Sequence, residues 1–429
     1  MFDFSNILNF RKSELVQNSA KLISANVIAQ IIGVAVYPLL TRLYSPDDFG
    51  LLNLFLSIGG VLIILANAEL QYSIIIPKSE TTAVACFHNG LSIMVGVTLF
   101  CILTTPFSTQ IANLFNTPQL ADWLYFIPTF VFISSFWVLL NYWYIRNKQF
   151  GKISTYQIVQ CATSVCTKCG FGFIGFTAGG MIISSIIAPL FSILINIKTS
   201  FKKILTPLLN INKQECAFAA KEYINFPKYD LPRALINNLS SNLPFFLLTP
   251  YFSLAEMGFL GMAFTLALRP INMIVSSVNH VLFQKVAELV QNRQKVNPLI
   301  KQFIKYCLLI IIPSFCVLYF FLPYLTKLLL GDGWETTGQY IRLMLPWLGI
   351  VCICGSLNFI PDVFKKQRGL LCFEIIYLII RVISLSVGIL SDNFLLCIIL
   401  FSISSALIIL IECFWFVKTV KNYDLQLVK

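Results

Sequence analysis

Three basic side chains lie inside long apolar stretches of this sequence, where a charge is costly. They are Lys168, Arg269 and Arg381. A lysine or arginine at the lipid-facing centre of a bilayer costs ~2.5–3.5 kcal/mol, so we expect all three to face protein or water. Lys168 and Arg269 have no acidic residue within two turns of the same helix. They are the first candidates for an anionic ligand, because lysine supplies a mobile point charge and arginine donates two directed hydrogen bonds to phosphate oxygens.

The third cation, Arg381, shares a predicted helix face with Glu374, two turns earlier. One interpretation is an ion pair that only stabilises helix packing. The other is a titratable carboxylate that exchanges a proton against the arginine and so couples transport to an ion gradient. We retain both, and predict Glu374 as the ion-coupling residue.

Amides near these cations extend the candidate site. Asn272 follows Arg269 within one turn, and Asn26 and Gln30 share a face of an earlier apolar stretch. Polar residues in such helices face protein or a wet cavity, although some only join helices at about 1 kcal/mol apiece. The predicted substrate-binding residues are Arg269, Lys168, Arg381, Asn272, Asn26 and Gln30.

The sequence has few residues that could form a metal or cofactor site. His88 and His280 are the two histidines of the chain, too few for a histidine-rich metal site or a choice of catalytic triads. Cys166 and Cys169 have redox spacing but lie inside an apolar run, and the thirteen cysteines resemble small buried hydrophobes. We expect no cofactor, no metal and no enzymatic activity.

The elements that carry these residues must be membrane-spanning helices. Hydrophobic residues make up 57% of the 429 and charged residues 12%, against about 25% charged in a soluble domain. This excludes a soluble enzyme and a nucleic-acid binder. A span needs about 20 apolar residues, which predicts an all-α polytopic membrane protein with about twelve transmembrane helices. They are 22–41, 49–76, 84–107, 122–143, 153–175, 178–197, 234–252, 256–283, 303–325, 338–361, 370–390 and 393–417.

The basic residues predict the orientation. Most of the 31 lysines and arginines fall in loops on the side of the termini, whereas the opposite loops hold Arg42 and Lys327. Because cytoplasmic loops are enriched in these residues, both termini are predicted to be cytoplasmic. The net charge of +12 then reflects topology and contact with anionic lipid.

The chain repeats one pattern in two halves. Ser45 and Asp48 precede one predicted span as Ser253 and Glu256 precede another, in the spacing of a helix-capping box. Chance likeness between two apolar hairpins is the alternative. Two copies of six spans share one orientation, as in many transporters. The predicted division is an N-terminal six-helix lobe at 1–197, a cytoplasmic interlobe linker at 198–232 and a C-terminal six-helix lobe at 233–429.

The run Thr41-Arg-Leu-Tyr-Ser-Pro-Asp-Asp-Phe-Gly50 resembles the first hairpin of the polysaccharide transporter family. These are O-antigen and capsule repeat-unit flippases of the multidrug/oligosaccharidyl-lipid/polysaccharide exporter superfamily. The resemblance implies two six-helix lobes forming a V-shaped central cavity. It also implies translocation of undecaprenyl-pyrophosphate-linked oligosaccharide across the bacterial inner membrane, with membrane lipids and polysaccharide polymerase machinery as partners.

Two alternatives remain. A cation-coupled multidrug exporter of the same superfamily would need intramembrane acids, and Glu69, Glu374 and Glu412 stand against the three cations. A membrane glycan polymerase or ligase would usually present a long extracytoplasmic loop, whereas the longest one predicted here is 107–121. The balance of charges favours an anionic substrate.

Overall fold

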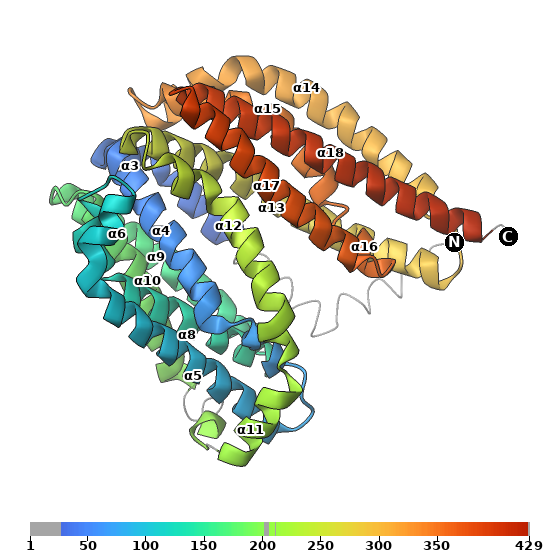
Figure 1. Cartoon of the computed structure of the whole chain (residues 1–429), viewed down its shortest axis with the longest axis horizontal. Coiled ribbons are helices and arrows are strands. Elements are labelled where there is room, and N and C mark those ends of the chain that lie inside the picture. Colours follow the sequence, from blue (N-terminus) through green and yellow to red (C-terminus); the bar gives the residue numbers. More distant parts are fainter. Residues whose placement is uncertain (1–26, 201–205, 211, 428–429) are drawn as a thin grey trace. The chain divides into compact units, whose positions relative to one another are not determined.

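The computed structural model describes residues 27–200, 206–210 and 212–427, and in this part of the chain every regular element is a helix (Figure 1). The predicted site residue Asn26 lies outside the described residues. The chain divides into two compact units, Met1–Asn238 and Leu239–Lys429, called unit 1 and unit 2 below.

The helices of unit 1 are mostly long, with short one-turn elements between them. They are α3 (Tyr37–Leu43), α4 (Pro46–Asn67), η1 (Leu70–Ile74), α5 (Glu80–Thr104), η2 (Thr105–Phe107), α6 (Ser108–Leu114), α7 (Leu120–Leu124), α8 (Ile127–Arg146), α9 (Phe150–Phe173), α10 (Ala178–Ser200), η4 (Thr206–Leu209), α11 (Lys213–Glu222) and η5 (Phe226–Asp230). The unit boundary lies inside α12 (Leu231–Leu248).

Unit 2 consists of five long helices and one short one. They are α13 (Leu254–Gln291), α14 (Asn297–Leu330), α15 (Glu335–Gly355), α16 (Ile360–Val363), α17 (Gln367–Leu390) and α18 (Phe394–Gln426). The longest, α13, has 38 residues, or about 57 Å at 1.5 Å per residue, so it extends well beyond a hydrocarbon layer of ~30 Å.

Nine helices in the described part of the chain are long and apolar enough to cross a membrane. The protein is therefore a multi-pass membrane protein. Three predicted spans, 22–41, 153–175 and 234–252, fall instead on the shorter apolar helix Val27–Leu43, on α9 and on α12. In α9 the apolar character is diluted by Gln157, Gln160 and Lys168. The full set of twelve spans stays a prediction.

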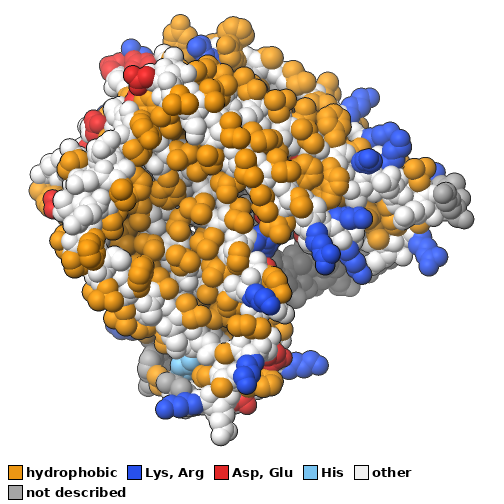
Figure 2. Space-filling model, in the orientation of Figure 1, with side chains coloured by type: hydrophobic (Ala, Val, Ile, Leu, Met, Phe, Trp, Pro, Cys, Tyr) orange, Lys and Arg blue, Asp and Glu red, His pale blue; other side chains and the backbone are white. Residues whose placement is uncertain are grey.

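The distribution of apolar and charged side chains along the helices is that of a protein in a lipid bilayer. Apolar side chains cover broad areas of helix surface, and lysines and arginines gather at helix ends, as where α14 begins and α18 ends (Figure 2). Many large apolar residues are exposed on α14, including Leu309, Ile310 and Phe320. Such a surface is stable in lipid and would not be stable in water.

The two predicted capping boxes are confirmed. The Ser45 backbone amide donates to Asp48 Oδ2 at 2.9 Å at the start of α4, and the Ser253 amide donates to Glu256 Oε2 at 3.1 Å at the start of α13. Each serine hydroxyl accepts in return from the backbone amide three residues on. The boxes therefore satisfy amide protons that a helix start leaves without partners.

Unit 1 is held together by aromatic packing between α4, α5 and α8. Phe55, Trp143 and Tyr144 are almost fully buried, and the rings of Phe55 and Phe130 lie 5.4 Å apart. The start of α10 is tied to α4 because Asp48 Oδ1 accepts from the Ala178 amide at 2.7 Å. One carboxylate thus completes its own cap and positions a second helix.

The segment predicted as an interlobe linker contains a helix that packs on unit 1. In α11, Glu215 Oε2 accepts from the Thr82 hydroxyl at 3.2 Å, and the Cys216 carbonyl accepts from Asn89 Nδ2 at 2.9 Å. Both donors belong to α5. The described part of this segment is therefore anchored to the first unit.

Unit 2 has two apolar clusters. The larger joins α13, α15, α17 and α18 around Met257, Met344 and Cys397. The smaller surrounds Val286 and Phe416, and its polar tie is Asp424, whose two carboxylate oxygens accept from the Val296 and Asn297 amides at 2.8 and 2.9 Å. An acid at the start of α14 is favourable because of the helix dipole.

Candidate functional site

Arg269 lies in the interior of α13 and is exposed. It stands fifteen residues after Leu254, about 22 Å along a helix of about 57 Å, so it lies in the interior of a helix long enough to cross the membrane. Pro270 follows inside the helix and removes one backbone hydrogen bond there. An exposed arginine at such a position has to meet water or an anion, because lipid would penalise it.

The polar residues along α13 are of two kinds. Thr265 and Ser276 donate their hydroxyl protons to carbonyls of their own helix, Gly261 and Met273, at 2.9 and 3.1 Å. Asn272, one turn beyond Arg269, is exposed. Arg269 and Asn272 are therefore exposed polar side chains about one turn apart whose polar groups are candidates for contact with a ligand.

Further along α13, Asn279 joins two helices, which is the packing role that polar residues of membrane helices often have. Its Nδ2 donates to the Gly355 carbonyl at the end of α15, at 3.3 Å. A polar residue thus satisfies a carbonyl at a helix end, which otherwise lacks an intrahelical donor.

Lys168 lies in α9 of unit 1 and is half-buried. Its backbone carbonyl accepts a hydrogen bond from the Tyr44 hydroxyl at 2.7 Å. This bond fixes α9 against the hairpin that precedes α4 and so holds the lysine on a rigid element. Gln30 is also half-buried, in a helix whose Ala29 carbonyl accepts from the Cys161 thiol of α9 at 3.3 Å.

Arg381 lies in the packed interior of unit 2, with 4% of its surface exposed. Its Nε donates to Ser405 Oγ at 3.1 Å, and its Nη1 donates to the Ser240 carbonyl and hydroxyl at 2.9 and 3.2 Å. Its Nη2 donates to the Tyr377 hydroxyl. Every guanidinium nitrogen is engaged by protein, which corrects the expectation that this side chain is presented to a ligand.

Aromatic rings enclose the same guanidinium. Its centre lies 3.8 Å from the ring centroid of Tyr377, 4.6 Å from that of Phe401 and 5.7 Å from that of Trp347. Cation–π attraction is strongest where water is excluded. Together with the hydrogen bonds, it explains how an arginine is accommodated within the apolar core of this unit.

Glu374, the predicted coupling residue, lies in α17 and is half-buried, with its carboxylate oxygen Oε2 buried. Its negative charge acts on Glu412 of α18, a neighbouring helix in unit 2. The two acids stand on packed helices, and like charges on neighbouring helices oppose one another. The sequence did not pair these acids, since they stand on different helices.

The sequence also missed a polar cluster just beyond the end of α4. Glu69 has a left-handed backbone with φ of 58°, is 9% exposed, and accepts from Gln71 Nε2 at 3.0 Å. Burial raises the pKa of the Glu69 carboxyl, and the charge of Asp230 adds to the rise, whereas the Gln71 hydrogen bond and Arg233 oppose it. The predicted span 49–76 hid this cluster, because the helix ends at Asn67.

Within the part of the chain that the structure describes, no three histidine, cysteine or acidic side chains converge in a way that would hold a metal ion.

The sequence matches a known protein family. The chain belongs to the polysaccharide biosynthesis protein family, whose model matches residues 39–338. No curated protein matches the sequence.

Solved structures share the fold at low sequence identity. The lipid II flippase MurJ in an inward closed conformation is 16% identical, with a TM-score of 0.71 over 96% of this chain and 91% of that one. An inward-facing multidrug resistance MATE family transporter of the MOP superfamily is 11% identical, with a TM-score of 0.70 over 94% and 95%. A MOP superfamily transporter from Pyrococcus furiosus, described as having a binding pocket of reversed polarity, is 14% identical, with a TM-score of 0.55 over 94% and 96%.

Proposed function

We propose that this protein is a flippase that moves undecaprenyl-pyrophosphate-linked oligosaccharide units across the bacterial inner membrane by alternating access, for surface polysaccharide synthesis. Membership of the polysaccharide biosynthesis family supports the pathway, and likeness to MurJ supports a lipid-linked substrate. The observation that carries the proposal is Arg269, an exposed cation in the middle of a long membrane helix.

Arg269 is proposed to bind the pyrophosphate of the carrier. Its planar guanidinium can donate two parallel hydrogen bonds to phosphate oxygens, and low dielectric strengthens such contacts. Asn272, exposed one turn away, can donate to the same headgroup or to the first sugar. Lys168 is the proposed cation of unit 1, and Gln30 and Asn26 stay candidates for sugar hydroxyls.

Arg381 is proposed to have a structural role. Its donors bind Ser240, Tyr377 and Ser405, and breaking them to bind a ligand would leave buried polar groups without partners.

Coupling is proposed to reside in unit 2. Glu374 is the predicted site, and the neighbouring Glu412 adds a second carboxyl that can share one cation with it. Moving a large anionic headgroup against a gradient needs a driving force. Proton or sodium entry at this pair would supply it.

The test compares three variants in cells lacking the native protein. Arg269→Ala is expected to lower surface glycan and purified-protein binding of undecaprenyl pyrophosphate by one to two orders of magnitude, as loss of a charged hydrogen bond of about 1.5–3 kcal/mol predicts. Arg269→Lys keeps the charge and should retain part of the binding. Thr265→Ala is the matched control, because its hydroxyl bonds only within its own helix in the described residues.

Membrane abundance has to be equal in all three variants. Normal glycan display by Arg269→Ala would overturn the assignment.

The multidrug exporter is the second candidate, supported by the Glu374 and Glu412 pair and by likeness to a MATE family transporter. Efflux of cationic dyes by cells carrying the protein, lost on Glu374→Gln and unaffected by Arg269→Ala, would favour this alternative over the flippase.

A further inference from the structure

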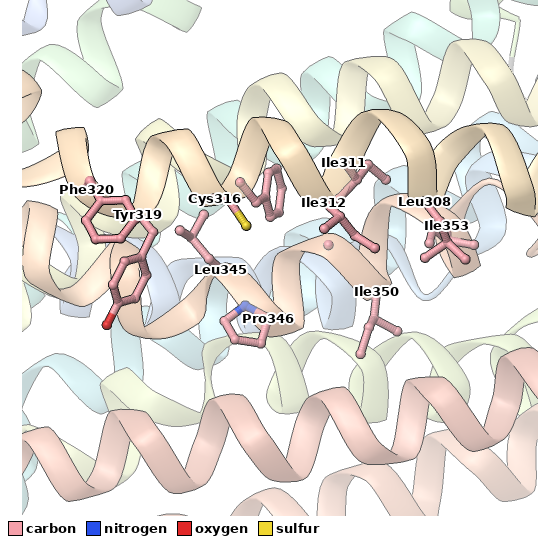
Figure 3. Close-up of a pocket in the computed structure, with 12 residues that line it drawn as sticks. Leu308, Ile311, Ile312, Cys316, Tyr319, Phe320, Leu345, Pro346, Ile350 and Ile353 are labelled. Atoms are coloured by element: carbon pink, nitrogen blue, oxygen red, sulfur yellow. The ribbon is translucent and has the colours of Figure 1, made fainter.

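An apolar groove runs along the outer side of unit 2, between α14 and α15. Its volume is about 470 Å³, and its walls include Leu308, Ile312 and Tyr319 from α14 and Pro346 and Ile350 from α15 (Figure 3). Figure 3 shows these side chains directed into the space between the two helices. The lining is almost entirely hydrocarbon and aromatic.

A second hollow continues the groove toward the beginning of α14. It has a volume of about 530 Å³ and shares Leu308 and Ile312 with the first. At its far end lie Lys301 and Lys305, one turn apart and both exposed. By the predicted topology, this is the cytoplasmic end of α14.

The other end of the groove also carries a cation. Arg342 of α15 stacks on the Tyr319 ring, with its guanidinium centre 5.1 Å from the ring centroid. Its Nε is buried and makes no hydrogen bond within the described part of the chain. An arginine held against an aromatic wall in this way has donor capacity to spare.

The length of the groove restricts what fits it. From Lys301 to Phe320 the helix rises about 28 Å, close to the full hydrocarbon thickness of ~30 Å. An acyl chain of an ordinary phospholipid stays in one leaflet, so it would fill about half of this length. A single, longer apolar chain would fill all of it.

We propose that this groove holds the isoprenoid chain of a polyprenyl phosphate carrier, with the phosphate end meeting Lys301 and Lys305 on one side of the membrane and Arg342 on the other. The inference rests on the proposed function and deepens it by assigning the carrier tail a site separate from Arg269. The phosphate-bearing end of the chain would pass from one end of the groove to the other as the headgroup changes sides, while the rest of the chain remains between α14 and α15. The lining is mostly aliphatic and includes the rings of Phe315, Tyr319 and Phe320, which suits an unsaturated, methyl-branched chain.

The test uses the full-length protein in nanodiscs of phosphatidylcholine. The probe is a polyprenyl phosphate with a photoactivatable diazirine near the end of its chain, and adducts are mapped by mass spectrometry. We expect adducts within 308–320 and 345–353. Unlabelled polyprenyl phosphate should reduce their formation, and the same concentration of phosphatidylglycerol should not. Equal competition by phosphatidylglycerol, or adducts elsewhere, would overturn the proposal.

Two variants of α14 supply a matched pair. Ile312→Trp places a large ring in the groove and should weaken labelling about tenfold. Ile310→Trp adds the same bulk at an exposed position that lines neither hollow, so labelling should be unchanged. Equal labelling of the two variants, or a change in oligomeric state caused only by Ile312→Trp, would point to another occupant, such as a second copy of the chain.

A further pair of variants tests the charged residues at the end of the groove. Lys301→Gln combined with Lys305→Gln should weaken labelling by the phosphate probe and leave labelling by the corresponding alcohol unchanged, with Lys295→Gln as the control. Loss of this difference would contradict the assigned phosphate end. If glycan translocation fails in cells while labelling of the groove is intact, the flippase proposal is contradicted and the tail-binding proposal is not. The two proposals can therefore fail separately.

Discussion

At the scale of single residues, the membrane cations have different roles because of what surrounds them. Arg381 is enclosed by rings and hydroxyls, whereas Arg269 is exposed. A charge avoids lipid, so Arg381 is stabilised by protein partners, and Arg269 is expected to face water or an anion. The residue type is the same, but only Arg269 has a side chain that is exposed, which is why a ligand role is proposed for it and a packing role for Arg381.

Arg381→Lys is predicted to destabilise unit 2. Lysine cannot reach Ser240, Tyr377 and Ser405 together, so at least one hydrogen bond to a charged group is lost, at about 1.5–3 kcal/mol. Thermal unfolding in detergent measures the effect. Ser384→Ala is the control, since that hydroxyl bonds to its own helix at Ile380. If Arg381→Lys leaves stability unchanged and abolishes carrier binding, the result would instead support a ligand-binding role for Arg381.

Glu69 is predicted to make stability depend on pH. Because burial raises its pKa above the ordinary carboxyl value, the native protein holds this proton more tightly than the unfolded chain. The stabilisation is complete below the unfolded pKa and is lost as pH rises through the raised native value. Glu69→Gln should remove this slope, and Glu80→Gln, at an exposed position, should keep it. Unfolding temperatures measured across this pH range test the prediction, and an unchanged slope in Glu69→Gln would refute it.

At the scale of elements, local rules were predictable and long-range contacts were not. The caps at Ser45 and Ser253 follow from residues three apart, so the sequence was enough to predict them. The partnership of Arg381 with Ser240 joins positions 141 apart, and no spacing rule relates them. The end of α4 at Asn67 was missed for another reason, because apolar residues continue beyond it into η1.

Removing either capping serine is predicted to cost about 1 kcal/mol of stability. Ser45→Ala and Ser253→Ala each leave helix amides without an acceptor, so both should lower the unfolding temperature by similar amounts. Ser45→Asp should restore most of the loss, because a carboxylate also caps helix starts. If neither serine variant is less stable than the native protein, the boxes contribute nothing in lipid.

At the scale of the whole molecule, charge asymmetry predicts how the chain lies in the membrane. The loops on one side hold most of the lysines and arginines, which assigns that side to the cytoplasm. The anchored helix α11 belongs to the same side and carries Lys213 and Lys221. If the proposed function holds, this predicted orientation places the lysine-rich ends of the spans on the side where the substrate is made.

The orientation is tested in a cysteine-free background with one cysteine introduced at a time. A cysteine at Lys213 should resist a membrane-impermeant maleimide in intact cells and react after lysis. A cysteine at Asp332, an exposed residue in the loop after α14, should react in intact cells. The reverse pattern would invert the topology.

The carboxylate of Asp424 has a consequence for the order of synthesis. It completes the start of α14 from a position 128 residues further along the chain, near the end of the last helix. A ribosome makes the chain from its amino end, and domains generally fold as units while this proceeds. Unit 1 can therefore assemble during translation, whereas the start of α14 lacks this acceptor until the chain has been made as far as Asp424. Unit 2 can thus complete its packing only after α18 has been made.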